Sequence, residues 1–196
     1  MKLKNITQLR RHARGATLIE ALVSILVLSL GLMGIAGLQL NAMAYQKSSW
    51  ATHRVAELTS DIGERIRANP AGATNGNYTY TANYATAKTA AIVSNSCRTS
   101  GAACTTAQIA NDDLSAWIAK AQTALPGGAV NLEGASNTGF TVTAMYMDKD
   151  FVNNTGVLQS SAVCTTATVG IAWRNCCPAA AATPAGVRCS RSDIIP

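Results

Sequence analysis

The sequence has few charged residues, few aromatic residues and almost no histidine. Only 13% of its 196 residues are charged and 5% are aromatic, whereas 48% are hydrophobic. This composition argues against an intrinsically disordered chain and against a polybasic nucleic-acid binder. The two histidines, His12 and His53, supply little material for a metal or catalytic site, and His53 is expected to be a solvated surface side chain. No glycine-rich phosphate loop or Gly-x-Ser-x-Gly turn occurs, so we expect no enzyme, no catalytic residue, no cofactor and no metal.

The positive charge of the chain is concentrated at its N-terminus. The formal net charge is +6, but residues 1–15 hold five of the 16 basic residues and none of the 10 acidic ones, so the remainder has a net charge of +1. An uncharged run of 26 residues follows, from Ala21 to Gln46. It exceeds the roughly 20 apolar helical residues that span a bilayer. Because the basic residues precede it, the positive-inside rule predicts a cytoplasmic N-terminus and an exported C-terminal domain.

A single acidic residue, Glu20, adjoins this apolar run. A charged side chain in hydrocarbon costs roughly 2.5–3.5 kcal/mol on insertion scales, so a buried Glu20 requires a partner. The alternative is that Glu20 lies at the membrane interface and stays hydrated. Membrane physics alone leaves these two interpretations equally favoured.

The N-terminal sequence resembles a known export signal. Arg10–Gly15 followed by Ala16–Val23 is similar to the class III leader of type IV prepilins: a short basic segment, a glycine, and an apolar helix with glutamate at its fifth position. The resemblance implies that a prepilin peptidase cuts after Gly15 and methylates the new N-terminus at Ala16, a position usually occupied by phenylalanine. It also implies that Glu20 pairs with the freed amino group of a neighbouring subunit.

Downstream segments narrow the resemblance. Gly31–Gln39, Ala56–Leu58 and Asp61–Pro70 are similar to the type IV pilus modification protein PilV family of minor pilins. The resemblance implies an α+β pilin fold, in which a long N-terminal hydrophobic helix packs against a C-terminal antiparallel sheet head stapled by disulfides. The implied organisation is a leader at residues 1–15, a helix at 16–69 with its membrane or filament-core part at about 16–46, and a globular head at 70–196.

The same resemblance implies a function and partners. A PilV-like minor pilin is anchored in the inner membrane with its head in the periplasm, and then primes and enters a type IV pilus at the cell surface. Its expected partners are the prepilin peptidase, other minor pilins, the major pilin and a tip adhesin, and its expected roles are adhesion and twitching motility. A minor pseudopilin of a type II secretion system is one alternative. A DNA-binding pilin is another, but no nucleic acid is expected because Arg174, Arg188 and Arg191 are too few to form a binding surface.

The second half of the long helix carries an apolar stripe. Val55, Leu58, Ile62 and Ile66 recur at helical spacing, which predicts the face that packs on the head. Asn69–Pro70 predicts the end of this helix, because a residue before proline resists the helical conformation. In the apolar half, Gly31, Gly34 and Gly37 recur every third residue. They indicate either close helix packing or local softness of the helix.

The head is predicted to contain one further helix and two strands. Residues 71–110 are typical of a surface excursion, that is, a long surface segment with little strand. Asp112 and Asp113 are predicted to start an amphipathic helix that ends at Leu125. The alternation in Phe140–Met147 and in Thr168–Trp173 predicts two strands of an antiparallel sheet.

All six cysteines lie in the second half of the chain: Cys97, Cys104, Cys164, Cys176, Cys177 and Cys189. In an exported domain an even number of cysteines predicts disulfides. Cys97 and Cys104 enclose a short loop and are expected to pair. Cys164 and Cys189 are the candidate partners of Cys176 and Cys177, in an order that the sequence leaves open. A zinc site is disfavoured because no Cys-x-x-Cys pair occurs.

Overall fold

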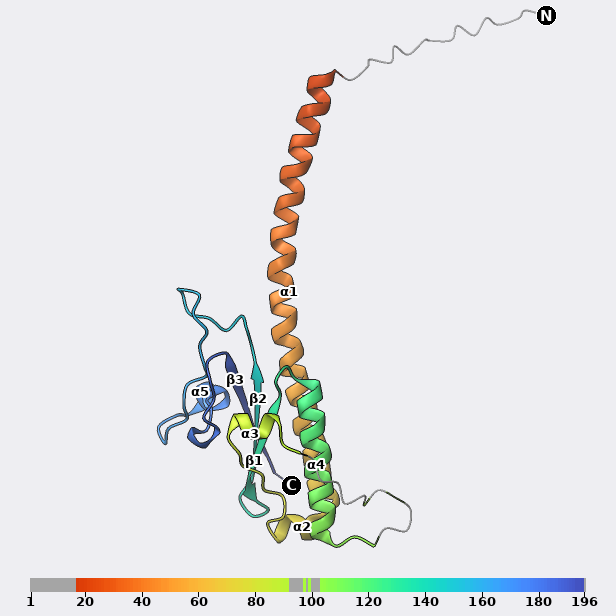
Figure 1. The fold of residues 1–196 in the computed structure, drawn as a ribbon, viewed down its shortest axis with the longest axis vertical. Coiled ribbons are helices and arrows are strands. Elements are labelled where there is room, and N and C mark those ends of the chain that lie inside the picture. Colours follow the sequence, from red (N-terminus) through yellow and green to blue (C-terminus); the bar gives the residue numbers. More distant parts are fainter. Residues whose placement is uncertain (1–16, 92–96, 98, 100–102, 196) are drawn as a thin grey trace, which may run out of the picture. The chain divides into compact units, whose positions relative to one another are not determined.

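The computed structural model describes residues 17–91, 97, 99 and 103–195, and the chain divides between Tyr45 and Gln46 into two compact units. Helix α1 belongs to both units. The elements in chain order are α1 (Leu18–Ala68), α2 (Pro70–Thr74), α3 (Tyr84–Lys88), α4 (Thr106–Ala124), β1 (Ala129–Ala135), β2 (Gly139–Met147), α5 (Gly170–Asn175), the 3-10 helix η1 (Ala179–Ala181) and β3 (Val187–Ile194) (Figure 1).

The first unit contains the apolar part of α1. Leu18–Met43 has a mean hydropathy of 2.4, and by length and composition it is able to cross a membrane. A core helix of a soluble protein passes the same test, but its side chains would be buried. None of this stretch is buried here, and even its largest apolar side chains are exposed, for example Leu22 at 67% and Leu30 at 63%. The segment is therefore an apolar helix that its own unit leaves uncovered.

The C-terminal part of α1 lies in the second unit and forms one wall of its core. The predicted stripe of Val55, Leu58, Ile62 and Ile66 is buried, with exposed fractions of at most 4%. The helix ends at Ala68, as the Asn69–Pro70 pair predicted. Asn69 instead caps α2, since its side-chain oxygen accepts a hydrogen bond from the Gly72 amide at 3.1 Å and Pro70 occupies the first turn of α2.

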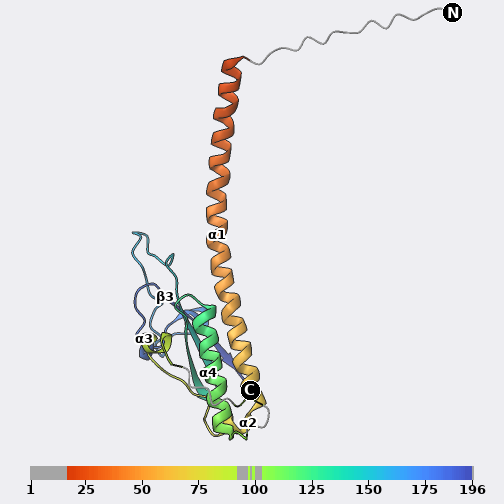
Figure 2. The ribbon, with the colours of Figure 1, turned by 45° about the vertical axis from the view of Figure 1, so that its right-hand side comes forward.

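Helix α4 lies beside the C-terminal part of α1 in both views (Figures 1 and 2). The predicted start at Asp112 is wrong, because α4 begins at Thr106. A capping box fixes this start: Thr105 Oγ1 accepts from the Gln108 amide at 3.3 Å, and Gln108 Oε1 accepts from the Thr105 amide at 2.9 Å. The predicted apolar face is confirmed, since these residues are all buried: Leu114, Trp117, Ile118, Ala121 and Leu125.

In the described residues, three strands form one antiparallel sheet in the order β1–β2–β3. The predicted strand at Phe140–Met147 is confirmed as β2, which pairs Val142 with Leu132 of β1 and with Ser192 of β3. Its predicted inner face belongs to the core shared with α1 and α4: Phe140, Val142, Ala144 and Tyr146. The opposite face, which includes Met145, packs in a second core with residues of α3, η1 and β3. The sheet is therefore covered on both faces.

The predicted strand at Thr168–Trp173 is wrong, because these residues lead into the short helix α5. Gly170 has φ +62, which interrupts an extended run. Val169 and Ile171 are 74% and 80% exposed, so their alternation does not mark a buried face. The strand that completes the sheet is β3, whose arginines, serines and aspartate hid its pattern.

Residues 70–91, which include the start of the predicted surface excursion, contain the two helices α2 and α3. Tyr80 also forms an isolated bridge with Leu132 of β1. Tyr78 is fully buried and Tyr84 is 3% exposed, so both rings contribute to the cores. The sequence did not reveal that these tyrosines are buried, because they are spread among small polar residues.

Candidate functional site

The start of α1 places Glu20 at the first turn of the apolar segment. Thr17 caps the helix, because its Oγ1 accepts a hydrogen bond from the Glu20 amide at 3.3 Å. Glu20 thus occupies the third helical position, where a carboxylate interacts favourably with the helix dipole. Its side chain is exposed, and no described residue forms an ion pair with it. Gly15 and Ala16, the predicted cleavage and methylation positions, lie outside the described residues.

The three glycines of the apolar segment leave open space along α1. An added Cβ at Gly31, Gly34 or Gly37 would have no heavy atom within 4 Å, and α1 remains helical through all three positions. Each glycine therefore leaves the helix surface without a side chain at its position, while the backbone there stays α-helical. A neighbouring helix could approach the backbone closely at these positions.

A network of charges and hydrogen bonds fastens α4 and the tyrosine of the following segment to α1. Arg65 of α1 donates to Asp113 of α4 at 3.0 Å and to Asp61, four residues earlier on α1, at 3.3 Å. Tyr78 donates its hydroxyl hydrogen to Asp113 at 2.7 Å. Asp113 was predicted to start a helix, but the structure makes it the acceptor that joins three segments.

Two pKa values report this packing. Burial, followed by the hydrogen bond to Asp113, raises the pKa of the Tyr78 hydroxyl well above its usual value. The hydrogen bond from Lys120, followed by that from Arg54, lowers the pKa of Glu57 below 4.5. Lys120 lies on α4, 3.0 Å from Glu57 of α1, so this pair also connects the two helices. These contacts join α4 and Tyr78 to α1 within the head.

Three disulfides pair all six cysteines: Cys97–Cys104, Cys164–Cys176 and Cys177–Cys189. We call them the loop cystine, the α5 cystine and the core cystine. The loop cystine is the predicted pair, and the other two resolve the order that the sequence left open. The core cystine is buried in the second core and ties the segment after α5 to β3.

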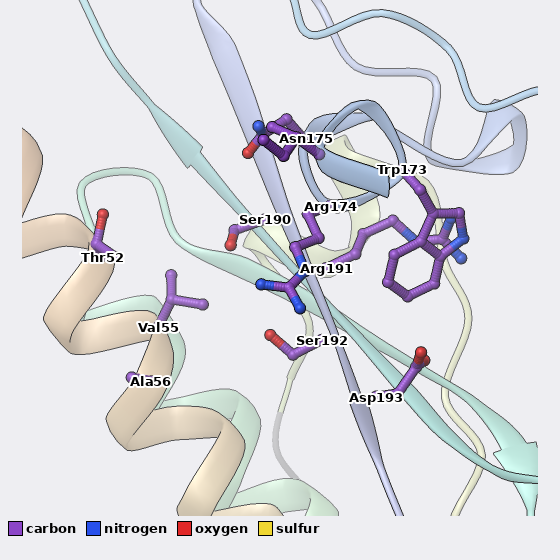
Figure 3. Close-up of a pocket in the computed structure, with 11 residues that line it drawn as sticks. Thr52, Val55, Ala56, Trp173, Arg174, Asn175, Ser190, Arg191, Ser192 and Asp193 are labelled. Atoms are coloured by element: carbon purple, nitrogen blue, oxygen red, sulfur yellow. The ribbon is translucent and has the colours of Figure 1, made fainter. Parts of the chain in front are cut away.

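A cavity of about 550 Å³ opens beside β3 (Figure 3). Its walls are Thr52, Val55 and Ala56 of α1, Ile171, Trp173, Arg174 and Asn175 of α5, and Ser190, Arg191, Ser192 and Asp193 of β3. The Arg191 guanidinium carbon lies 4.4 Å from the ring centre of Trp173, and its Nη1 lies 3.3 Å from Cys164 Sγ. We call this cavity the β3 groove.

The groove and the network were not predicted from the sequence. Trp173 was assigned to a strand face, but it lies on α5 under Arg191. His53 is exposed on α1, as predicted. Among the described residues, no group of three or more His, Cys, Asp or Glu side chains is placed to hold a metal ion.

Comparison with known protein families gives two matches. Residues 37–115 match the family described as Type IV pilin Tt1218, and residues 10–36 match the Prokaryotic N-terminal methylation motif. The two matches run without a gap from residue 10 to residue 115, and so include Glu20, the apolar segment, the rest of α1 and the first half of α4. No curated protein and no solved structure matches the chain.

Proposed function

Since this chain belongs to the type IV pilins, we propose that it is a PilV-like minor pilin that primes assembly of the pilus and is then incorporated into it. The observation that carries the proposal is one continuous helix, α1, whose first part is exposed and apolar and whose second part is built into the core of a disulfide-bonded head. Such a subunit has a segment for the membrane or filament core and a separate domain for the filament surface. This is a structural role.

We propose that the chain is made with a leader at residues 1–15 and cut by a prepilin peptidase between Gly15 and Ala16. The methylation motif matched at residues 10–36 supports this step and methylation of Ala16. The mature chain would then consist of the helix at residues 16–69 and the head at residues 70–196. Cleavage at this position removes the basic leader and keeps the apolar segment that begins at Leu18.

Glu20 is the proposed assembly residue. In the mature chain it lies in the first helical turn, close in sequence to the new amino terminus at Ala16. Pairing with the amino group of a neighbouring subunit would neutralise two charges that are expensive in an apolar surrounding. The exposure of Glu20 and the absence of an ion-pair partner among the described residues support this role.

Before assembly, the chain is proposed to be a single-pass inner-membrane protein with its head in the periplasm. The basic residues before the apolar segment support this orientation, and the three disulfides suit an oxidising compartment. The resemblance of Asp61–Pro70 to PilV supports a minor role near the pilus tip, with other minor pilins, the major pilin and an adhesin as partners. Adhesion and twitching motility are the functions that this position would support.

The decisive experiment is a strain that lacks this chain, scored in parallel for surface pili, twitching and protein secretion. Loss of pili and twitching with normal secretion is the expected result. Loss of secretion with normal pili would contradict the proposal and assign the chain to the alternative, a minor pseudopilin of a type II secretion system. Complementation with the wild-type chain is the control for both readouts.

Glu20→Ala tests the assembly residue in the same strain. We expect the variant to insert in the membrane normally but to be depleted from sheared pili. Ser24→Ala is a matched control, because Ser24 lies one turn further along the same segment and its hydroxyl only donates to the Glu20 carbonyl. Mass spectrometry of the mature chain should find an N-methylated Ala16. Normal incorporation of Glu20→Ala, or an intact leader in the pilus, would reject the mechanism.

A further inference from the structure

Strand β3 forms an edge of the described sheet, and its outward backbone groups can be identified. The Ser161 amide donates to the Val187 carbonyl at 3.1 Å, and the Cys189 amide donates to Ser161 Oγ at 3.1 Å. The backbone groups of Val187 and Cys189 therefore point away from β2. The register of β3 with β2 is regular over its whole length, so the alternation of an antiparallel strand also turns Arg191 and Asp193 outward.

The outward groups of Arg191 and Asp193 are open, whereas those on either side are covered. Within residues 103–195, no described residue bonds the amide or the carbonyl of these two residues. Ser161 covers the beginning of the strand, and Arg67 donates to the Ile195 carbonyl at 3.3 Å just after its end. Open edge groups are a template for pairing with another strand. The open stretch of β3 is therefore limited to Arg191 and Asp193.

The β3 groove lies along this open stretch. Figure 3 shows β3 passing between α1, which carries Val55 and Ala56, and α5, which carries Trp173 and Arg174. The cavity volume of about 550 Å³ is that of an ordinary ligand pocket. An added strand would thus have backbone partners on β3 and a wall on each side for its alternating side chains.

The charges of the groove favour an acidic occupant. Arg174 is exposed and has no ion-pair partner among the described residues. Arg191 contacts the Trp173 ring and the sulfur atoms of Cys164 and Cys176, and it forms no ion pair with a carboxylate of the described residues. The one carboxylate of the groove, Asp193, already accepts a hydrogen bond from Thr141 Oγ1 at 2.7 Å. Two arginines and one aspartate line the groove, so it keeps a net positive charge beside open backbone donors and acceptors.

We propose that the β3 groove binds an extended, acidic segment of another protein by strand addition to β3. Main-chain hydrogen bonds to Arg191 and Asp193 supply the register, and a carboxylate of the partner pairs with Arg174. Apolar side chains of the partner face Val55 and Ala56. The occupant is a peptide segment because the groove offers main-chain donors and acceptors at strand spacing.

Peptide binding to the full-length chain in detergent micelles tests the proposal. The probe is a capped five-residue peptide that alternates valine and aspartate, and the control peptide alternates valine and lysine. We expect saturable binding of the acidic peptide only, measured by fluorescence anisotropy. In hydrogen exchange, the amides of Arg191 and Asp193 should exchange rapidly in the free chain and slowly in the complex.

Two variants at one position separate backbone pairing from side-chain effects. Asp193→Ala and Asp193→Pro both remove the carboxylate, but only the proline removes the outward amide, and proline is tolerated at an edge whose amide faces solvent. The proline variant should bind the acidic peptide about fivefold more weakly than the alanine variant, as expected for one lost hydrogen bond. Arg174→Glu should weaken acidic-peptide binding about threefold or more and permit binding of the lysine peptide.

Three results would overturn the proposal. Equal affinity of Asp193→Ala and Asp193→Pro would show that β3 does not pair with the peptide. Absence of acidic-peptide binding would mean that Arg174 and Arg191 prevent the edge of β3 from pairing with any strand. If sedimentation shows that the chain self-associates in micelles and that Asp193→Pro abolishes this, the occupant is a second copy and not an acidic partner.

Discussion

Replacement of Trp117 by phenylalanine tests how the head is held on α1. Trp117 is fully buried on α4, and its indole Nε1 donates to the Leu58 carbonyl of α1 at 2.8 Å. Phenylalanine keeps the apolar contact but loses this bond, at about 1 kcal/mol. The smaller ring leaves a cavity worth about 1–2 kcal/mol more. We therefore expect Trp117→Phe to lower the free energy of unfolding by about 2–3 kcal/mol, and Trp117→Ala by about 3–5 kcal/mol.

The assay is urea unfolding of the detergent-solubilised chain with its disulfides intact, followed by near-ultraviolet circular dichroism. Trp50→Phe is the matched control, because Trp50 is 44% exposed on the same helix as Leu58, and we expect a change below about 0.5 kcal/mol. A loss below about 0.5 kcal/mol for Trp117→Phe would refute the reasoning. It would mean that α4 does not depend on this contact with α1.

Three further predictions follow from the head. Joint replacement of Cys177→Ser and Cys189→Ser should lower the free energy of unfolding by about 2–5 kcal/mol in the same urea assay, more than removal of the partly exposed loop cystine. The pKa of Glu57 is lowered in the folded state, so the ionised carboxylate stabilises the fold above pH 4.5, and this contribution is lost as the pH falls through the folded pKa. Glu57→Gln should therefore make the thermal midpoint less sensitive to acid. The pKa of Tyr78 is raised in the folded state, so its neutral form stabilises the fold below pH 10, and this contribution is lost at higher pH. An absorbance titration should therefore find Tyr78 un-ionised at pH 10. Comparison with Tyr78→Phe identifies its share of the tyrosine signal.

Strong periodic signals were predictive in this chain. The apolar run before Gln46 and the stripe at Val55, Leu58, Ile62 and Ile66 identified α1, because a helix repeats its faces at a fixed spacing. The alternation at Phe140–Met147 identified β2 in the same way. Asn69–Pro70 marked the end of α1, since proline disfavours the helical conformation of the residue before it.

Weak or mixed signals misled. Val169 and Ile171 alternate like a strand, but Gly170 turns the chain into α5 and leaves both side chains in solvent. Asp113 looked like a helix start because acidic residues favour first turns, whereas the capping box at Thr105 starts the helix. In both cases a neighbouring residue outside the pattern, Gly170 or Thr105, decided where the helix begins.

The amino-acid order alone determined the cluster of basic residues at positions 1–15, the apolar segment with Glu20 and the even number of cysteines, because each can be read directly from the printed sequence. Tertiary structure decided which cysteines pair, why Asp113 meets Arg65 and Tyr78, and which strand forms the open edge. The residues that these disulfides and hydrogen bonds join lie 12 to 48 positions apart in the chain, and no local pattern specifies which of them meet. Only the packing of the sheet between α1 and the disulfide-bonded segment brings their side chains and backbone groups together.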